Sequence, residues 1–526
     1  MQSDILRIYR SLHTWTGVIA GLALFIAFYA GALTMFKPTL DRWASPADTT
    51  VPTVEADRLP GLVRSVLAQH PEAGREFMLH LNPAENRPAS LSWEVRHAAP
   101  GTEEHHHGGP AQRMLAGLDA DDTLVVQSSR PSPMAELIDR LHQTAGIPGG
   151  DGHDLVGGYV MGVVSIFYVL ALVSGLIIFL PVIARELFAL RLGKSVKRFW
   201  RDAHSLIGIT ALPFHLVIGL TAIVFSLHDF FYAGLQQTVY GDKPLFSFSR
   251  PGPGGEARDP REMLPPQQLV ENLAESAPEF RVTEMKYQNI FSEHARVWVM
   301  GEADGHMMRG GDFGFAILDP YSGAMISSDY LPGHQEGWVA AVTVFFGLHF
   351  GNFGGMTVQW VYFLLGIGGA FLFYSGNLLW IENRRRKEHT GTAFLANATV
   401  GVSWGSVAGV AAAMVVGKWL HGYVEDSAML YLWTYYSVFL SAVAWSFYTG
   451  AARALPKLLW LCAVTVWAIP LTGLLAWLFP SLPAWVHLHP ETLAVEFTAL
   501  VIGTLFAVAA FGREGTLKRV KATRPI

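Results

Sequence analysis

The sequence predicts a polytopic α-helical membrane protein of about eight spans, with two α+β modules outside the membrane. Its composition is the first indication, since 51% of the 526 residues are hydrophobic, only 15% are charged and the mean hydropathy is +0.29. Apolar runs long enough to cross about 30 Å of hydrocarbon are the second indication. These runs lie near 14–36, 155–181, 206–228, 357–381, 395–418, 428–450, 457–479 and 493–511. The third indication is an internal repeat, which predicts that the two modules share one plan.

The distribution of lysine and arginine predicts the orientation of the spans. The linkers 182–203 and 382–394 and the C-terminal tail are basic, whereas the short loops near 420–427 and 480–491 carry no lysine or arginine. All basic clusters therefore fall on the side of the N-terminus, and both termini are expected in the cytoplasm. The first span is expected to be a retained anchor. Its apolar part is too long for a signal peptide, and no small-residue cleavage site follows it closely.

Residues 1–181 and 204–381 repeat one order of elements: a span, an α+β module and a second span. Each first span carries a histidine four residues before a glycine, His13 in one copy and His204 in the other. Both copies enter the membrane from the same side, so the repeats are expected to be parallel and related by an axis along the membrane normal. Residues 395–526 hold four further spans that do not follow the repeat and are expected to form an appendage.

The first module, 37–153, and the second, 229–337, show the same local patterns. Amphipathic helices are predicted from "LPGLVRSVLAQH" and "LPPQQLVENLAESA". Strands are predicted from "EFMLHL", "ASLSWEVR" and "DTLVVQSS" in the first module and from "FRVTEMKYQ", "ARVWVMG" and "FGFAILDPYSGAMISS" in the second. A Leu-His pair closes each copy, at His142 and at His349, before a glycine-containing turn and the next span.

The four repeated histidines form two predicted pairs. His13 and His204 lie at the cytoplasmic edge of the membrane and His142 and His349 at the opposite edge, so a pseudo-twofold axis lets each pair face each other at one depth. Two opposed imidazoles between apolar helices suit a six-coordinate haem b, in which neutral imidazole binds the iron. The sequence therefore predicts two haem b sites, one near each membrane surface.

His215 is a fifth candidate, on the same predicted helix face as His204. Eleven residues correspond to about three helical turns, or roughly 16 Å. His215 is therefore expected between the two levels, either as a ligand or electron-path residue or as packing near Pro213. The equivalent position of the first repeat is Leu24, so His215 is expected to matter less for haem retention than His204.

Four segments are similar to the PepSY-associated transmembrane helix family, over about residues 5–385. They are "LHTWTGVIAGLALFIAFYAGALTMF", "LPFHLVIGLTA", "LHFGNFGG" and "ILDPYSGAMISS". The resemblance implies a four-helix core with PepSY modules in the periplasm of a Gram-negative bacterium. Characterised members are inner-membrane haem b reductases of ferrisiderophores. The iron ligands that the resemblance carries over are His13, His142, His204 and His349. His215 belongs to the "ALPFH" variant of the third span, and the four C-terminal spans, which occur in longer members, gain no role from the resemblance.

The expected function is electron transfer across the inner membrane to a periplasmic ferric chelate, such as a ferric siderophore. A membrane quinol or a separate cytoplasmic reductase is the expected electron donor. No G-x-G-x-x-G follows a predicted strand, and the cytoplasmic loops are too short for a nicotinamide or flavin domain. No acid–base catalytic residue is predicted, because the protein supplies the position and potential of its haems. Arg140, His334 and Trp338 are expected to line the substrate cleft, and nucleic acid is not an expected partner.

Two other functions fit parts of the sequence. One is a haem-free membrane regulator of a peptidase, because PepSY modules also occur in such proteins, but it gives no reason for four histidines at matching depths. The other is a permease for a metal or a siderophore, which predicts charged groups near the middle of the spans. The spans contain few such groups, Glu496 being an exception. A visible spectrum separates these alternatives from a haem protein.

Two sequence features bear on metal and redox chemistry. The stretch "EEHHHGG" at 103–109, which holds His105, His106 and His107, predicts either a transition-metal site or a solvated loop. The single cysteine, Cys462, excludes an intrachain disulfide. Together with the lack of a C-x-x-C-H motif, it also excludes covalent c-type haem attachment and a cysteine-held iron–sulfur cluster.

Overall fold

The computed structural model of the protein divides into two compact units. We call Met1–Ala44, Ser132–Lys243 and Trp360–Ile526 the membrane unit, and Ser45–Pro131 and Pro244–Gln359 the sheet unit. The structure describes residues 3–46, 51–81, 89–95, 112–150, 155–183, 196–241, 257–311, 313–384, 390–424 and 426–522.

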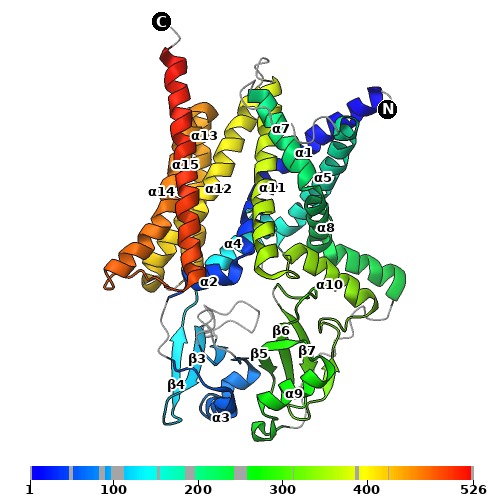
Figure 1. Ribbon diagram of the computed structural model, residues 1–526, viewed down its shortest axis with the longest axis vertical. Coiled ribbons are helices and arrows are strands. Elements are labelled where there is room, and N and C mark those ends of the chain that lie inside the picture. The colour runs from blue at the N-terminus through cyan, green and yellow to red at the C-terminus, as the bar shows by residue number, and fades with distance from the viewer. Residues whose placement is uncertain are drawn as a thin grey trace. The chain divides into compact units, whose positions relative to one another are not determined.

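Eight helices among the described residues are long and apolar enough to cross a membrane, which confirms the predicted fold class. They are α1 (Ser3–Thr34), α5 (Val156–Phe179), α8 (Leu212–Leu235), α11 (Gly355–Arg384), α12 (Thr390–Leu420), α13 (Ser427–Thr449), α14 (Ala451–Leu478) and α15 (Pro490–Ala522). Their sequences are apolar around most of the helix, as is typical of helices that contact lipid or other helices on all sides. The start of α1 and the end of α15 lie at the same end of the membrane unit (Figure 1).

Three shorter helices complete the repeated part of the membrane unit. They are α2 (Lys37–Ala44), α4 (Met134–Thr144) and α7 (Val196–Thr210). A break at Ala211 separates α7 from α8, because Pro213 stands in the first turn of α8 and has no backbone N–H to continue the α7 hydrogen bonds. A second break lies inside α8 at Leu227, where φ is −119° and ψ is 15°.

The sheet unit contains one eight-stranded antiparallel sheet with the order β4-β3-β2-β1-β5-β6-β7-β8. The strands of the first module are β1 (Glu76–His80), β2 (Leu91–Val95), β3 (Gln112–Leu118) and β4 (Leu124–Ser129). Those of the second module are β5 (Arg281–Gln288), β6 (Arg296–Glu302), β7 (Gly314–Leu318) and β8 (Met325–Ser327). The sequence predicts a strand in the region of each of these except β3, whose stretch "QRMLAGL" alternates poorly.

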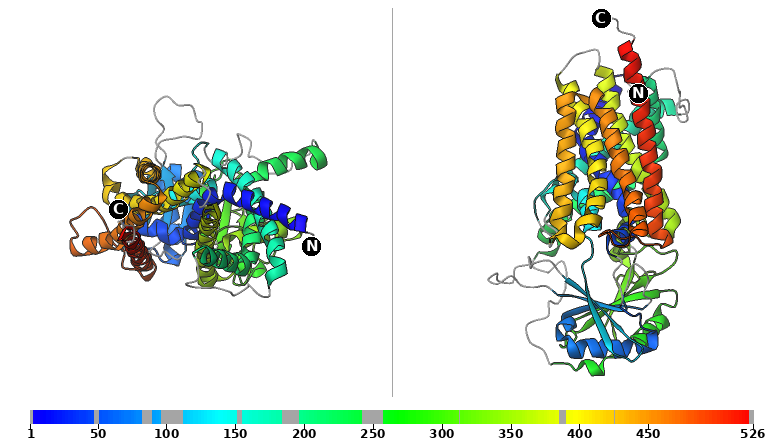
Figure 2. Two further views of the ribbon diagram at one scale, coloured as in Figure 1. Left: turned by 90° about the horizontal axis from the view of Figure 1, so that it is seen from above. Right: turned by 90° about the vertical axis from the view of Figure 1, so that its left-hand side faces the viewer.

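The two predicted modules therefore share one sheet, joined where β1 pairs with β5. Phe77 lies opposite Tyr287 in this pairing, and the two rings stack with centroids 4.7 Å apart. Because β1 and β5 are equivalent strands of the two repeats and run antiparallel, an approximate two-fold axis between them relates the strand order of the two halves of the sheet. The right-hand view of Figure 2 shows this sheet with its helices.

One helix from each repeat completes the core of the sheet unit. These helices are α3 (Leu59–Gln69) and α9 (Pro266–Ser276), as predicted from their amphipathic patterns. Leu62 and Val66 of α3 and Leu269 and Leu273 of α9 are buried in the same cluster as the inward-facing strand residues. Burial alternates along β6 and β7, so one face of these strands is buried in the core and the other is partly exposed.

The boundaries of the units differ from those of the predicted modules. The ends of the first module, α2 and α4, belong to the membrane unit, whereas α10 (Gly337–Phe350) belongs to the sheet unit. The appendage is also not a separate body, because its helix α12 shares a core with α1: the Trp404 ring lies 6.4 Å from Phe25 and 5.2 Å from Tyr374. Large aromatic side chains from distant parts of the chain thus join α1, α11 and α12.

Candidate functional site

A cavity of about 380 Å³ lies in the membrane unit among α1, α5, α7, α8 and α11. Its walls are mainly apolar, with side chains such as Val18, Leu172 and Leu372. Two of the predicted ligands, His13 from α1 and His204 from α7, face this cavity. The structure therefore brings together the first predicted pair, although its members are 191 positions apart in the chain.

The imidazoles of His13 and His204 are close and approximately perpendicular. Their ring centroids lie 6.2 Å apart and their planes make an angle of 74°. A metal–imidazole bond is about 2 Å long, so two imidazoles on opposite sides of one metal ion have ring centroids about 6 Å apart. The observed separation fits a single metal ion bound between the two rings.

Backbone carbonyl groups select the tautomer of both rings. The His13 Nδ1 atom lies 2.8 Å from the carbonyl oxygen of Ala171, and the His204 Nδ1 atom lies 3.1 Å from that of Leu372. A carbonyl oxygen only accepts hydrogen bonds, so each Nδ1 carries the proton and donates it. Nε2 is then the unprotonated nitrogen of each ring, which is the form that binds a metal.

A glycine one turn beyond each acceptor gives the histidine access to the backbone. Gly175 follows Ala171 by four residues, and a Cβ atom there would lie 2.9 Å from His13 Cε1. Gly376 follows Leu372 by four residues, and a Cβ atom there would lie 3.2 Å from His204 Cε1. Residues four apart lie above one another on a helix, so a side chain at either glycine would press on the imidazole.

The third predicted ligand, His142 of α4, is held in the same way. Its Nδ1 atom lies 2.8 Å from the carbonyl oxygen of Ala27 on α1, and a Cβ atom at Gly31 would lie 2.6 Å from this nitrogen. Ala27 lies about four helical turns beyond His13 on α1, which corresponds to roughly 20 Å. The membrane unit thus contains two histidine levels with one hydrogen-bonding pattern. The three glycines are not predicted from the sequence, because their only signal is a spacing of four residues from acceptors that the sequence does not identify.

The fourth predicted ligand, His349, lies near the end of α10 in the sheet unit. It is half-buried, and its ring contacts Phe350 edge to face at 5.7 Å. The helix ends two residues later at Gly351 in a left-handed conformation, as α4 ends at Ala145 three residues after His142. The repeat is therefore preserved in local structure, and the pairing of His142 with His349 stays a prediction.

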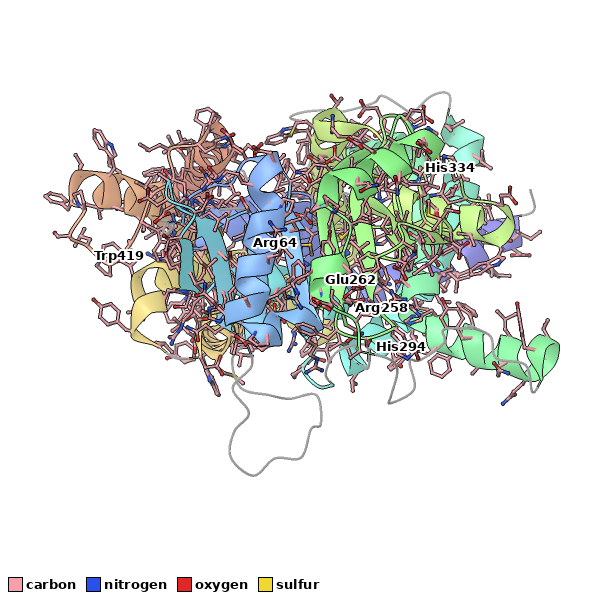
Figure 3. All side chains as sticks on the ribbon, turned by 90° about the horizontal axis from the view of Figure 1, so that it is seen from below. Arg64, Arg258, Glu262, His294, His334 and Trp419 are labelled. Carbon is pink, nitrogen blue, oxygen red and sulfur yellow. The ribbon has the colours of Figure 1, made fainter. Side chains whose placement is uncertain are left out.

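The residues expected to line a substrate cleft lie in different units. Arg140 is on α4 of the membrane unit. His334 precedes α10 in the sheet unit and is labelled in Figure 3. Trp338 lies in the first turn of α10 with 62% of its surface exposed. Their part in a common cleft stays a prediction, and His105–His107 lie outside the described residues.

His215 is fully buried within an aromatic cluster. Its Nδ1 atom lies 2.7 Å from the Tyr168 hydroxyl group, and among the described residues its Nε2 atom has no hydrogen-bond partner. The Phe28 ring lies 5.7 Å from the imidazole, and Phe28 follows Ala27, the acceptor of His142. On the other side, Tyr168 lines the cavity that holds His13 and His204. His215 therefore contacts residues of both histidine levels.

The donor set favours a metal that brings further ligands with it. Within the described parts of the chain, no group of three or more histidine, cysteine, aspartate or glutamate side chains is placed to hold a bare metal ion. Two neutral imidazoles alone leave most coordination positions of a transition metal unfilled. A metal held in an apolar macrocycle would fit both the histidine pair, as its protein ligands, and the apolar cavity walls.

Comparison with known proteins identifies a family for the repeated part of the chain. The sequence model of the PepSY-associated TM region matches residues 10–383, which include all five candidate histidines and both halves of the sheet. A search of curated proteins finds no match to this chain. The matched region is more than half of the chain and agrees with the resemblance found in its motifs. The protein is therefore a multi-pass membrane protein that belongs to the PepSY-associated TM family.

Proposed function

We propose that this protein is a haem b oxidoreductase of a bacterial inner membrane, which carries electrons to a ferric chelate such as a ferric siderophore. The observation that carries the proposal is the pair of His13 and His204. Their ring centroids are 6.2 Å apart and both rings face an apolar cavity. The Nδ1 atom of each ring donates a hydrogen bond to a backbone carbonyl group.

The residues around the cavity have complementary parts in holding a haem. His13 and His204 would bind the iron through Nε2, while the Ala171 and Leu372 carbonyl groups keep the proton on Nδ1 and increase the basicity of Nε2. The apolar side chains lining the cavity would exclude water from the macrocycle. A bound haem would supply a one-electron Fe(III)/Fe(II) couple.

A second haem is proposed between His142 and His349. The hydrogen bond from His142 to Ala27 supports it, because it repeats the arrangement of the first site about four turns further along α1. Between the levels, an aromatic cluster surrounds His215: the Tyr168 ring lies 5.6 Å from Phe28 and 5.4 Å from Phe373. This cluster would keep water out of the space that separates the two sites.

The proposed direction of electron flow follows from the charge pattern. The basic linkers favour an orientation with both termini in the cytoplasm, and the sheet unit would then lie in the periplasm. A quinol or a separate cytoplasmic reductase would then deliver electrons on the side of His13 and His204. A bulky ferric chelate in the periplasm would receive them on the side of His142 and His349.

The test is a visible spectrum of the purified protein, followed by reoxidation. We expect sharp reduced α-bands of b-type haem, with about two haems per chain. Dithionite-reduced protein mixed with a ferric siderophore should reoxidise quickly, and the His142→Ala variant should retain the haem at the other site but reoxidise much more slowly. A protein without haem bands would overturn the proposal and favour the regulator or permease alternatives. Equal reoxidation by both proteins would overturn the periplasmic exit through His142.

The glycines facing the histidines provide a second test. Gly175→Ala should weaken haem retention at the first site by roughly 10-fold or more, because the new Cβ atom displaces His13 from the Ala171 carbonyl group. Gly158→Ala is the matched control on α5, since its Cβ atom would meet only Leu155 at an ordinary 3.7 Å. Haem content during gel filtration measures the effect. Equal retention in both variants would contradict the role assigned to Gly175.

A further inference from the structure

We infer that Arg384, Trp380 and Thr14 form a carboxylate-binding end of the cavity, which would hold the propionate groups of the haem. This inference rests on the proposed function and extends it from the iron ligands to the recognition of the cofactor edge. All three residues line the cavity between His13 and His204.

The last turn of α11 supplies the cationic part of this end. Trp380 and Arg384 are four residues apart and therefore lie on the same helix face. The guanidinium carbon of Arg384 lies 4.2 Å from the centroid of the Trp380 ring. In the described ranges, no carboxylate forms an ion pair with Arg384. The Trp380 ring thus positions the guanidinium group, whose N–H donors are not used by a carboxylate of the described residues.

Trp380 contributes a second N–H donor to this end of the cavity. Its indole Nε1 atom is buried and, among the described residues, has no hydrogen-bond partner. An indole N–H is only a donor, and leaving a buried donor unpaired costs about 1–3 kcal/mol. An acceptor on a bound ligand would remove this cost.

Hydroxyl groups beside the two histidines add to the polar lining. Thr14 follows His13 and Ser205 follows His204, and both line the cavity. Each repeat therefore places a hydroxyl residue directly after its candidate iron ligand. The exposed side chain of Asn383, one residue before Arg384, also belongs to the lining.

This donor set matches a carboxylate better than a neutral ligand. Arginine presents several N–H groups in a planar fork that suits the two oxygens of a carboxylate, and it carries the opposite charge. A haem b has two carboxylates on one edge of an otherwise apolar disc. The cavity has a corresponding polarity: its walls are mainly apolar, the N–H donors of Arg384 and Trp380 come from the end of α11, and Thr14 of α1 also belongs to the lining.

The test compares haemin with haemin dimethyl ester, whose carboxylates are blocked. The full chain carrying His142→Ala is prepared without haem, so that only the His13–His204 site responds, and is titrated with each compound. We expect haemin to bind at least roughly 10-fold more tightly than the ester, because only haemin can pair with Arg384. Arg384→Gln should weaken haemin binding and leave ester binding unchanged. Trp380→Phe keeps the aromatic ring under Arg384 but removes the indole N–H group. It should weaken haemin binding less than Arg384→Gln does and leave ester binding unchanged.

Arg7→Gln is the matched control, because Arg7 is an exposed basic residue near the start of α1. It should bind both compounds as the parent chain does. The reduction potential of the remaining haem is an independent readout: it should fall in Arg384→Gln, since removing a nearby positive charge favours the oxidised iron. Equal binding of haemin and its ester by the parent chain would overturn the carboxylate site while leaving the haem proposal intact. Binding of neither compound would overturn the haem proposal itself.

Discussion

Replacing His204 by alanine is expected to remove about one of the two haems, and replacing His13 should remove the same one. Both rings face one cavity with centroids 6.2 Å apart, so they would serve one iron. The double variant should therefore lose no more haem than either single variant, as expected for two residues that act as a unit. The pyridine haemochromogen assay gives the stoichiometry, and the reduced spectrum shows which α-band is lost.

His215→Ala is the control for this experiment. His215 is buried near the same cavity, but its Nδ1 atom is bonded to the Tyr168 hydroxyl group and not to a backbone carbonyl group. We expect this variant to retain both haems. Loss of both haems in a folded His204→Ala protein, or of neither, would count against the pairing. If His215→Ala emptied a site that His204→Ala left filled, the haem would sit deeper than proposed.

The second large effect is expected at a buried cluster in the appendage. Lys418 of α12 is only 1% exposed, donates a hydrogen bond to the Trp485 carbonyl oxygen at 3.1 Å, and lies 3.9 Å from the centroid of the Trp43 ring. Glu496 of α15 accepts a 3.4 Å hydrogen bond from the Trp43 indole N–H group. A side chain at Gly473 would collide with Glu496, so α14 leaves room for this carboxylate.

Lys418→Met is expected to destabilise the protein by about 1–3 kcal/mol, because it removes the hydrogen bond to the Trp485 carbonyl oxygen and the contact with the Trp43 ring, and takes away a positive charge near Glu496. Glu496→Gln should destabilise by removing the counter-charge of Lys418. The double variant should recover part of the combined loss, since neither charge is then left alone. Thermal unfolding in detergent, followed by circular dichroism, measures the three variants against the parent. A double variant that loses as much as the two single variants together would contradict the coupling of Lys418 and Glu496.

This cluster also suggests what the appendage does for the repeated part of the protein. Trp43 belongs to α2, which connects α1 to the first residues of the sheet unit. Lys418, Trp485 and Glu496 all come from the appendage and all contact Trp43, the last two through hydrogen bonds. The appendage therefore holds α2 in place directly after the first span. The two large predicted effects concern different parts of the membrane unit.

Local chemistry alone determines much of this protein. A span is recognised from its own apolar length, because hydrocarbon cannot satisfy backbone groups outside a helix. For this reason the eight spans are predictable from the sequence. The helices α3 and α9 and seven of the eight strand regions follow from local patterns of apolar and polar residues. The positions of His13, His142, His204 and His349 follow from the repeat, which is also a property of the sequence itself.

The partners of these residues are decided only by the tertiary structure. The sequence predicts that His13 faces His204, but the acceptors Ala171 and Leu372 and the glycines beside them come from other helices. The same holds for the single sheet, which depends on pairing between β1 and β5 across some two hundred positions. Lys418 and Glu496 likewise read as isolated charges in apolar runs until Trp43 joins them. Contacts between distant segments depend on how helices and strands pack, and hydropathy and spacing along one chain do not encode that packing directly.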